Sequence, residues 1–396
     1  MGNAAAKFRR VVAVILDGVG IGAQPDAPRF GDEGSNSVGN VVRARGGLRL
    51  PHLAARGLGR LTRLPGLEDA AVVGAYGKLT MASAGKDSTS GHWEIAGVVL
   101  KENFPLFPEG FPAEAVDGLR EATGREFIGN RAASGTEIIE DLGAEHLKTG
   151  ALILYTSADS VCQLAAHVDV VPLEDLYEIG EQGRSAMTGP YAVGRVIVRP
   201  FAGQPGSFRR VSESRRDYSL PPPAPTLLDV LLGRGFDVRG VGKVDDMFAG
   251  RGFTRCRHTR DNADGIDTIK NELREDFEGL LLANLNDTDT AYGHRNDAAG
   301  YAAALEEFDD ALPSLESVMK PEDLLLILSD HGNDPTTPGT DHSREYAPLL
   351  VWRRGFAGEV SLGTRETLAD VGQTAAHNFA VGPLPAGTSF LNEILG

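Results

Sequence analysis

The sequence predicts an α/β fold with a central, mostly parallel sheet flanked by helices. Three short stretches consist almost entirely of apolar residues, at 11–16, 280–285 and 324–328. Stretches of this kind are typical of parallel strands that are covered by helices on both faces. Amphipathic helical patterns lie between them, at 226–232, 265–277 and 300–319. Strands that alternate with helices indicate parallel pairing.

Each apolar stretch leads into acidic residues. Asp17 directly follows the first stretch, Asp289 lies just beyond the second, and Asp330 lies just beyond the third. In open α/β sheets, ligands bind beyond the carboxyl ends of the strands. We therefore expect these carboxylates to share one site.

Histidines accompany two of these carboxylates, and the full set is Asp17, Asp289, His294, Asp330, His331 and His342. Any one of them alone fits a helix cap or a surface imidazole. Six together are difficult to explain in this way, because uncompensated buried charges are costly. Mixed carboxylate and imidazole ligands suit Mn²⁺ or Zn²⁺ better than Ca²⁺. Since six ligands exceed what one catalytic ion takes, two metal ions are expected.

The segment 86–94 carries three consecutive hydroxyls, on Ser88, Thr89 and Ser90, before a possible helix start. One of them could be a nucleophile activated beside a metal ion. On this segment alone, a helix cap or a serine-rich turn explains the pattern better.

Residues 104–216 are predicted to form a second domain, inserted between the two parts of the core, 1–103 and 217–396. Proline-rich segments at 104–112 and 220–225 flank it, as expected of linkers. Strands are expected at 151–156, 168–171 and 191–198, and helices at 113–123 and 173–182. The insert also concentrates arginines at Arg195, Arg199, Arg209, Arg210, Arg215 and Arg216. Arginine forks match phosphate oxygens. A solvated basic face is the simpler explanation for Arg209, Arg215 and Arg216, whereas Arg195 lies within an apolar strand pattern.

Composition excludes several classes of function. The chain has 39 Lys and Arg against 55 Asp and Glu, a net charge of −16, whereas nucleic-acid binding favours a basic surface. Two cysteines, Cys162 and Cys256, are too few for a disulfide framework and fit the reducing cytoplasm. No stretch approaches the roughly 20 apolar residues that span a membrane. The sequence carries no indication of an oligomeric state.

Five motifs carry a resemblance to a known family. They are Asp-Gly-Val-Gly-Ile-Gly at 17–22, Gly-Lys-Asp-Ser-Thr-Ser-Gly-His-Trp-Glu at 85–94, Tyr-Thr-Ser-Ala-Asp-Ser at 155–160, Gly-Arg-Val-Ile-Val-Arg-Pro-Phe at 194–201 and Asp-His-Gly-Asn-Asp-Pro at 330–335. In this order, from about residue 9 to the C-terminus, they resemble the prokaryotic phosphopentomutases of the alkaline phosphatase superfamily.

The resemblance implies an alkaline-phosphatase-like core that is interrupted by an inserted α+β cap domain. It implies an isomerase of nucleoside catabolism that interconverts ribose 1-phosphate and ribose 5-phosphate, and likewise the 2-deoxyribose phosphates. By motif position, Asp17, Asp330 and His331 would hold one Mn²⁺, and Asp289, His294 and His342 would hold the other. The family nucleophile, usually a threonine, corresponds to Ser88. This departure from the family leaves Thr89 and Ser90 as alternatives.

The resemblance further implies substrate contacts at Ser157, Asp159, Val161, Arg195, Ile197, Arg210 and Lys243. The expected reaction passes through a phosphoserine and a 1,5-bisphosphate, with ribose 1,5-bisphosphate or glucose 1,6-bisphosphate as activator. The inserted domain is expected to exclude water from the phosphoserine.

Other functions are compatible with parts of the pattern. A two-metal phosphatase or phosphodiesterase would use the same core ligands, and a cofactor-independent phosphoglycerate mutase would share them with a different insert. A non-catalytic sensor of sugar phosphates would retain the fold without turnover.

Overall fold

The computed structural model describes residues 6–157 and 159–395, which divide into two compact units. Unit 1 comprises Met1–Glu102 and Pro222–Gly396, and unit 2 is the intervening segment Asn103–Pro221. The sequence-based boundary after residue 216 falls at strand β8 (Arg216–Ser219). Because β8 pairs with a strand of unit 2, the chain stays in that unit up to Pro221.

The sheet of unit 1 has eight strands, with the three apolar stretches side by side at its centre. Strand β1 pairs in parallel with both β11 and β12. The order is β10 (Arg255–Arg257), β9 (Asp237–Val241), β11 (Gly279–Leu285), β1 (Arg10–Leu16), β12 (Asp323–Leu328), β13 (Ala347–Trp352), β2 (Gly74–Leu79) and β14 (Glu359–Arg365). Among the described residues of this sheet, β13 pairs antiparallel with both of its neighbours, and the other strand pairs are parallel. The predicted mostly parallel sheet is confirmed.

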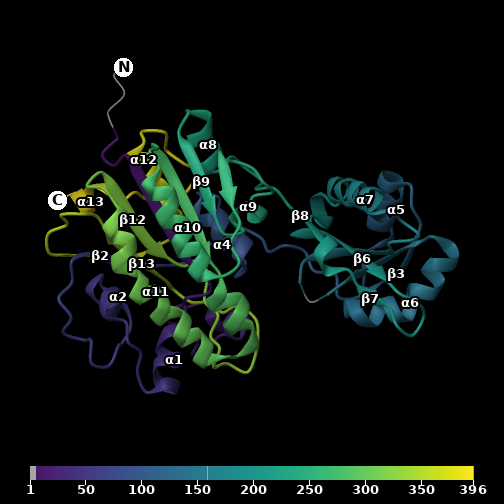
Figure 1. Cartoon of the computed structure of the whole chain (residues 1–396), viewed down its shortest axis with the longest axis horizontal. Coiled ribbons are helices and arrows are strands. Elements are labelled where there is room, and N and C mark those ends of the chain that lie inside the picture. The colour runs from purple at the N-terminus through teal and green to yellow at the C-terminus, as the bar shows by residue number, and fades with distance from the viewer. Residues whose placement is uncertain (1–5, 158, 396) are drawn as a thin grey trace. The chain divides into compact units, whose positions relative to one another are not determined.

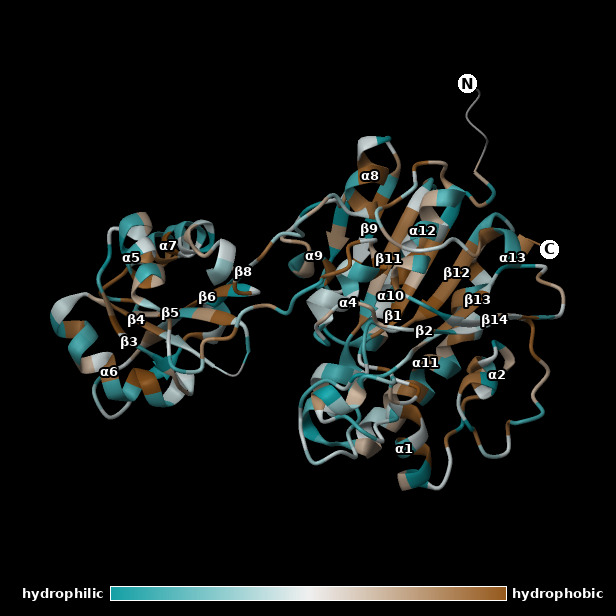
Figure 2. Ribbon diagram, turned by 180° about the vertical axis from the view of Figure 1, so that it is seen from behind, coloured by the Kyte–Doolittle hydropathy of each residue, from teal (hydrophilic) through white to brown (hydrophobic). Residues whose placement is uncertain are grey.

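Helices cover both faces of this sheet, because successive side chains of a strand point to opposite sides. Val12 and Val14 of β1 belong to the apolar core that one group of helices covers. These helices are α1 (Ser37–Arg45), α2 (Pro51–Ala55), α3 (Leu58–Leu61), α10 (Asn262–Arg274) and α11 (Ala298–Val318). Helices α10 and α11 of this group are labelled over the sheet in Figure 1. Val11 and Ala13 face the other group, which Figure 2 shows in front of the hydrophobic central strands. That group contains α4 (Ser88–Ile95), α8 (Leu227–Gly233) and α12 (Ala369–Asn378), while α9 (Val244–Met247) and α13 (Leu391–Leu395) are short.

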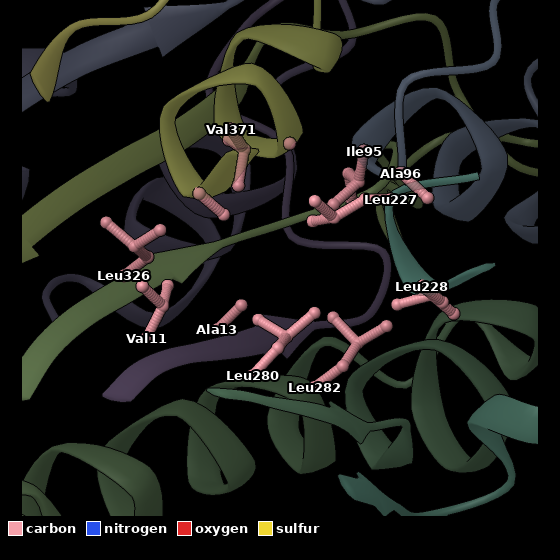
Figure 3. Close-up of a pocket in the computed structure, with 12 residues that line it drawn as sticks. Val11, Ala13, Ile95, Ala96, Leu227, Leu228, Leu280, Leu282, Leu326 and Val371 are labelled. Atoms are coloured by element: carbon pink, nitrogen blue, oxygen red, sulfur yellow. The ribbon is translucent and has the colours of Figure 1, made fainter. Parts of the chain in front are cut away.

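A small cavity lies on this second face, between the sheet and the helices α4, α8 and α12 (Figure 3). Its volume is about 10 Å³, and aliphatic side chains such as Val11, Leu227 and Val371 line it. This volume is at the lower limit for a single water molecule, and the apolar lining offers no hydrogen bond to hold one. The cavity is therefore a packing void and not a ligand site.

A buried ion pair joins the beginnings of β1 and β12. Arg10 donates to Asp323 through Nε at 2.7 Å and Nη2 at 2.5 Å, and both side chains are almost completely buried. We expect Arg10→Met to lower the free energy of unfolding by about 3–5 kcal/mol, because it leaves the Asp323 carboxylate buried without its cation. Denaturant unfolding measures this loss. The control is Arg9→Met, since Arg9 pairs with Asp276 on the surface, and an equal loss in both variants would contradict the prediction.

Unit 2 contains a second sheet with helices on both faces. Its strands are β3 (Phe127–Ala132), β4 (Leu152–Thr156), β5 (Val161–His167), β6 (Arg195–Ala202) and β7 (Arg209–Arg210), with β8 paired to β6. Helices α5 (Ala113–Thr123) and α7 (Leu173–Ala186) pack on one face, and α6 (Gly135–Thr149) packs on the other.

Two strand predictions in unit 2 require correction. The strand expected at 168–171 is wrong, because these residues form the turn that follows β5 and leads to Pro172 at the start of α7. The actual strand, β5, is fully buried but contains Gln163 and small residues that interrupt its apolar pattern. The strand expected at 191–198 begins later, at Arg195, because a 3₁₀ turn, η2 (Gly189–Tyr191), precedes it.

Among residues 6–157 and 159–395, no helix is long and apolar enough to cross a membrane.

Candidate active site

The carboxyl ends of β1, β11 and β12 bring the predicted acidic residues together. Asp17 follows β1, and its backbone N–H donates to the carbonyl of Leu285 at the end of β11. Asp289 lies in the single π-helical turn η4 (Asp287–Tyr292) after β11, and Asp330 follows β12. Parallel pairing of neighbouring strands thus produces the expected convergence.

Asp17, Asp330 and His331 form a buried group, called here the first triad. His331 Nε2 lies 3.3 Å from Asp17 Oδ1 and 3.3 Å from Asp330 Oδ2. The other oxygen of each carboxylate is held by the protein: Asn284 Nδ2 donates to Asp17 Oδ2 at 2.8 Å, and the His331 backbone N–H donates to Asp330 Oδ1 at 3.1 Å. One oxygen of each carboxylate therefore faces the imidazole without a hydrogen bond.

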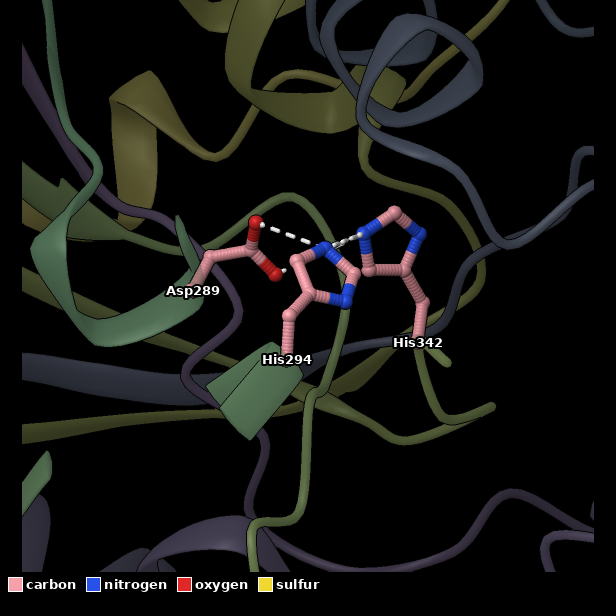
Figure 4. A group of neighbouring side chains, drawn as sticks. All are labelled: Asp289, His294 and His342. Atoms are coloured by element: carbon pink, nitrogen blue, oxygen red, sulfur yellow. Dashed lines mark hydrogen bonds and ion pairs between the residues drawn. The ribbon is translucent and has the colours of Figure 1, made fainter. Parts of the chain in front are cut away.

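Asp289, His294 and His342 form the second triad (Figure 4). His294 Nε2 lies 3.2 Å from Asp289 Oδ2, and His342 Nε2 lies 3.4 Å from Asp289 Oδ1. The two Nε2 atoms are 3.1 Å apart. Asn333 Nδ2 donates to Asp289 Oδ1 at 2.7 Å, and His294 Nδ1 lies 2.6 Å from the Thr340 carbonyl. These contacts with Asn333 and Thr340 orient the Asp289 carboxylate and the His294 ring.

The two triads are adjacent. The ring centroids of His331 and His342 are 4.0 Å apart. Burial and the nearby Asp330 carboxylate raise the pKa of Asp17 well above its usual value. Burial opposes the charged form of His331, but Asp330, Asp17 and Asp289 raise its pKa to about 9. The site therefore concentrates negative charge that a cation would offset.

This arrangement fits divalent metal ions. Asp17 Oδ1 and Asp330 Oδ2 are buried and have no hydrogen-bond partner among the described residues. Buried carboxylate oxygens are expected to be paired or to coordinate a metal. A third group, Asp245, Asp246 and His258, also brings three possible ligand atoms within 4.8 Å of one another, but its residues are partly or fully exposed. Exposed acidic clusters are common without a metal.

Ser88 is the hydroxyl that reaches the triads. It is the first residue of α4, and its Oγ lies 2.9 Å from His331 Nε2. Ser90 Oγ instead donates to Asp87 Oδ2 at 2.6 Å, and Asp87 Oδ1 accepts from the Ser90 backbone N–H. Asp87 thereby caps the helix. Ser90, one of the two alternative nucleophiles that the sequence left open, is therefore bound to the capping residue Asp87.

Two buried charged residues that sequence reasoning missed hold the segment before Ser88. Glu94 accepts from the backbone N–H groups of Ala82 and Ser83 at 2.8 and 2.6 Å. Arg344 donates to the carbonyls of Met81, Ser83 and Gly85 at 2.7–2.8 Å. Glu94 closes the quoted Gly-His-Trp-Glu motif, which was the available signal, whereas nothing in the sequence indicates the contacts of Arg344.

The residues expected to contact substrate lie in unit 2, with the exception of Lys243, which is exposed after β9 of unit 1. Val161 and Arg195 are register partners at the start of β5 and β6. Ser157 follows β4, and Asp159 is exposed in the loop between β4 and β5. Ile197 is buried within β6. The structure therefore gathers Ser157, Val161 and Arg195 at one edge of this sheet.

Arg210 is on β7, and its guanidinium reaches the first turn of α6, beside the Tyr155 hydroxyl. A Cβ atom at Gly135, the first residue of α6, would clash with Arg210 Nη2 and with the Tyr155 hydroxyl. Arg210 Nε and the Tyr155 hydroxyl are buried without hydrogen-bond partners among the described residues. Tyr155 was missed as a site residue, although it begins a quoted motif.

Comparison with known proteins decides the family. Residues 230–383 match the metalloenzyme superfamily. A phosphopentomutase of Thermotoga maritima is 53% identical over 388 residues, which cover 97% of this chain and 99% of that protein. A phosphopentomutase of Dictyoglomus turgidum is 52% identical over 388 residues, which cover 98% of each. The chain belongs to the phosphopentomutase family.

Membership of the phosphopentomutase family confirms the resemblance and makes the protein an enzyme of the isomerase class. Solved structures agree on the fold. A protein of Pyrococcus horikoshii has a TM-score of 0.51 at 16% identity, over 96% of this chain and 100% of that chain. Phosphoglycerate mutase of Leishmania mexicana has a TM-score of 0.50 at 13% identity, over 96% and 97%. The alkaline-phosphatase-like α/β fold predicted for this phosphopentomutase-family chain is confirmed.

Proposed function

We propose that the protein interconverts ribose 1-phosphate and ribose 5-phosphate, and the corresponding 2-deoxyribose phosphates, through a phosphoserine at Ser88. The observation that carries this proposal is the position of Ser88 Oγ, 2.9 Å from His331 Nε2, beside the contact between the two triads. The relatives at 52% and 53% identity are phosphopentomutases, and a phosphoryl group that moves between two positions of a pentose needs such a nucleophile.

Two Mn²⁺ ions are the proposed cofactors, one held by the first triad and one by the second. The mixture of carboxylate and imidazole ligands suits this ion. Bound there, the cations would neutralise the clustered carboxylates and polarise the oxygens of the transferring phosphoryl group. Asn284 and Asn333 would orient Asp17 and Asp289 from behind, as outer-shell partners of metal ligands do.

In the proposed reaction, Ser88 carries the phosphoryl group between substrate molecules. Phosphorylated Ser88 gives its phosphoryl group to the free hydroxyl of a pentose monophosphate: the sugar O–P bond forms, the serine O–P bond breaks, and the hydroxyl proton is released to Ser88. The resulting 1,5-bisphosphate returns its other phosphoryl group to Ser88: that sugar O–P bond breaks, the serine O–P bond forms again, and the serine proton passes to the sugar oxygen of the departing isomer. Each cycle begins with phosphorylated enzyme, so ribose 1,5-bisphosphate or glucose 1,6-bisphosphate is the expected activator.

Unit 2 is the proposed source of substrate contacts. Arg195 and Arg210 would bind the phosphate that does not react, since guanidinium groups pair with phosphate oxygens. The unpaired Tyr155 hydroxyl and the first turn of α6 beside Arg210 support this assignment, because helix amino ends favour anions. Asp159 would accept from a sugar hydroxyl. The remaining proposed contacts are Ser157, Val161 and Ile197 of unit 2 and Lys243 of unit 1.

Replacing Arg195 tests the role of unit 2. Arg195 is half-exposed and lies 3.4 Å from Asp217, a surface pair that contributes little to stability. We expect Arg195→Ala to lower kcat/KM for ribose 5-phosphate by roughly 10–100-fold, because a charge-assisted hydrogen bond to phosphate is lost. Hydrolysis of a simple aryl phosphate should change far less. Arg209→Ala, at an exposed position of β7, is the matched control. If Arg195→Ala lost activity equally on ribose 5-phosphate and on the aryl phosphate, Arg195 would have a structural role only.

One assay separates the proposed function from its closest alternative. Ribose 5-phosphate is supplied with Mn²⁺ and a trace of sugar bisphosphate, and ribose 1-phosphate and inorganic phosphate are followed in the same sample. Ribose 1-phosphate without matching release of phosphate supports the mutase. Dominant release of inorganic phosphate would overturn it in favour of a two-metal phosphatase or phosphodiesterase on the same core.

A further inference from the structure

His92 has no role in the function proposed above, yet it lies between the nucleophile and a proposed metal ligand. It is on α4, one turn after Ser88, and its side chain is completely buried. Its ring Nδ1 lies 2.8 Å from the Ser88 carbonyl oxygen and 3.1 Å from Asp330 Oδ2. Both oxygens are acceptors only, so Nδ1 must carry the proton. Its Nε2 is buried and has no hydrogen-bond partner among the described residues.

A glycine allows this approach of α4 to the end of β12. A Cβ atom at Gly91 would lie 2.5 Å from the Asp330 carbonyl oxygen and 2.8 Å from the Asp330 Cβ. Such distances are shorter than any van der Waals contact, so a larger residue at position 91 would move the helix away. The helix backbone therefore rests directly on Asp330, and the next residue, His92, reaches its carboxylate.

Four residues, Ser88, His331, Asp330 and His92, contact one another in a closed circuit. Ser88 Oγ contacts His331 Nε2, His331 Nε2 lies 3.3 Å from Asp330 Oδ2, and Asp330 Oδ2 lies 3.1 Å from His92 Nδ1. The circuit closes through the hydrogen bond from His92 to the Ser88 carbonyl. The orientation of the nucleophile and that of the Asp330 carboxylate are thereby fixed against one another.

We propose that His92 is a positioning residue that fixes the Asp330 carboxylate for metal binding and holds Ser88 beside it. Its Nδ1–H donates to the Ser88 carbonyl and lies against Asp330 Oδ2, 3.1 Å away. Asp330 Oδ2 itself has no hydrogen-bond partner among the described residues and is available to a cation. Partners of metal ligands commonly act in this way, and their loss weakens metal binding or activity by about 10–100-fold. This inference rests on the proposed metal site.

The test compares three substitutions at position 92 by titration calorimetry with Mn²⁺ alone. In His92→Asn the amide nitrogen takes the place of Nδ1, in His92→Gln it reaches the place of Nε2, and His92→Leu has no donor. We expect one Mn²⁺ to bind roughly 10–100-fold more weakly in His92→Leu and His92→Gln, and His92→Asn to recover most of the affinity. The rate constant for phosphorylation of Ser88 by a sugar bisphosphate, measured in a single turnover, should decrease in the same order. The steady-state KM for ribose 5-phosphate should change little.

Each result has a distinct meaning. If all three variants bind Mn²⁺ as the unmodified chain does, or if His92→Asn is no better than His92→Gln, the donor at Nδ1 has no positioning role and the inference is wrong. The Asn and Gln pair decides this even if His92→Leu does not fold. Since no substrate is present, failure of the unmodified chain to isomerise ribose phosphates leaves the Mn²⁺ comparison valid. Failure of the unmodified chain to bind Mn²⁺ overturns the metal proposal itself, and this inference with it.

Discussion

Ser88→Ala is expected to abolish formation of a phosphoenzyme and to lower the rate of isomerisation by about 10³-fold or more. The reason is that Ser88 Oγ is the hydroxyl beside His331, and alanine leaves no oxygen to accept the phosphoryl group. Incubation with labelled sugar bisphosphate, followed by denaturation and mass spectrometry, measures incorporation and locates the modified residue.

Thr89→Ala is the matched control, because Thr89 is adjacent in the chain and is likewise a hydroxyl residue. It should retain the phosphoenzyme and nearly all activity. Ser90→Ala should also be phosphorylated at Ser88, with a small loss of stability, since Ser90 contacts the capping residue Asp87. Label on Thr89, or activity that survives in Ser88→Ala, would move the nucleophile away from position 88.

Asp330→Ala is expected to remove one of the two proposed Mn²⁺ ions and to lower turnover by roughly 10³-fold or more. Asp330 presents an unpaired, buried carboxylate oxygen toward His331, and a catalytic metal supplies several kcal/mol of transition-state stabilisation. Metal content after dialysis is measured by elemental analysis, together with the rate of isomerisation. The second triad is intact in this variant, so one ion should remain.

Asp245→Asn is the matched control for the loss of a carboxylate. Asp245 belongs to the exposed third group with Asp246 and His258, and lies 2.8 Å from His258 Nε2. It should keep both ions and full activity. If Asp330→Ala retained normal metal content and rate, or if Asp245→Asn lost an ion, the assignment of the metal ligands would be wrong.

The core of the fold could be predicted from local pattern alone. Continuous apolar residues at 11–16, 280–285 and 324–328 require burial on both faces, and this identified β1, β11 and β12. The same reasoning failed at β5, where Gln163 is buried within the sheet. Its amide oxygen accepts a hydrogen bond from Arg199 Nε on the neighbouring strand, a pairing that no local pattern reveals.

The sequence by itself determined which residues were candidates, since carboxylates and imidazoles after buried strands have few structural explanations. It also determined, through its motifs, the family to which the chain belongs. Only the tertiary structure decided which candidates meet. Asp17 and Asp330 are more than 300 positions apart, and parallel pairing of β1 with β12 places both beside His331.

The proposal of Ser88 among three neighbouring hydroxyls likewise depends on tertiary contacts. Ser88, Thr89 and Ser90 have equivalent chemistry in the sequence, but α4 begins at Ser88 and directs only some of its side chains toward the triads. The roles of His92, Glu94 and Arg344 depend on backbone groups of distant segments. Every residue has such groups, so sequence patterns carry no information about which of them a side chain will contact.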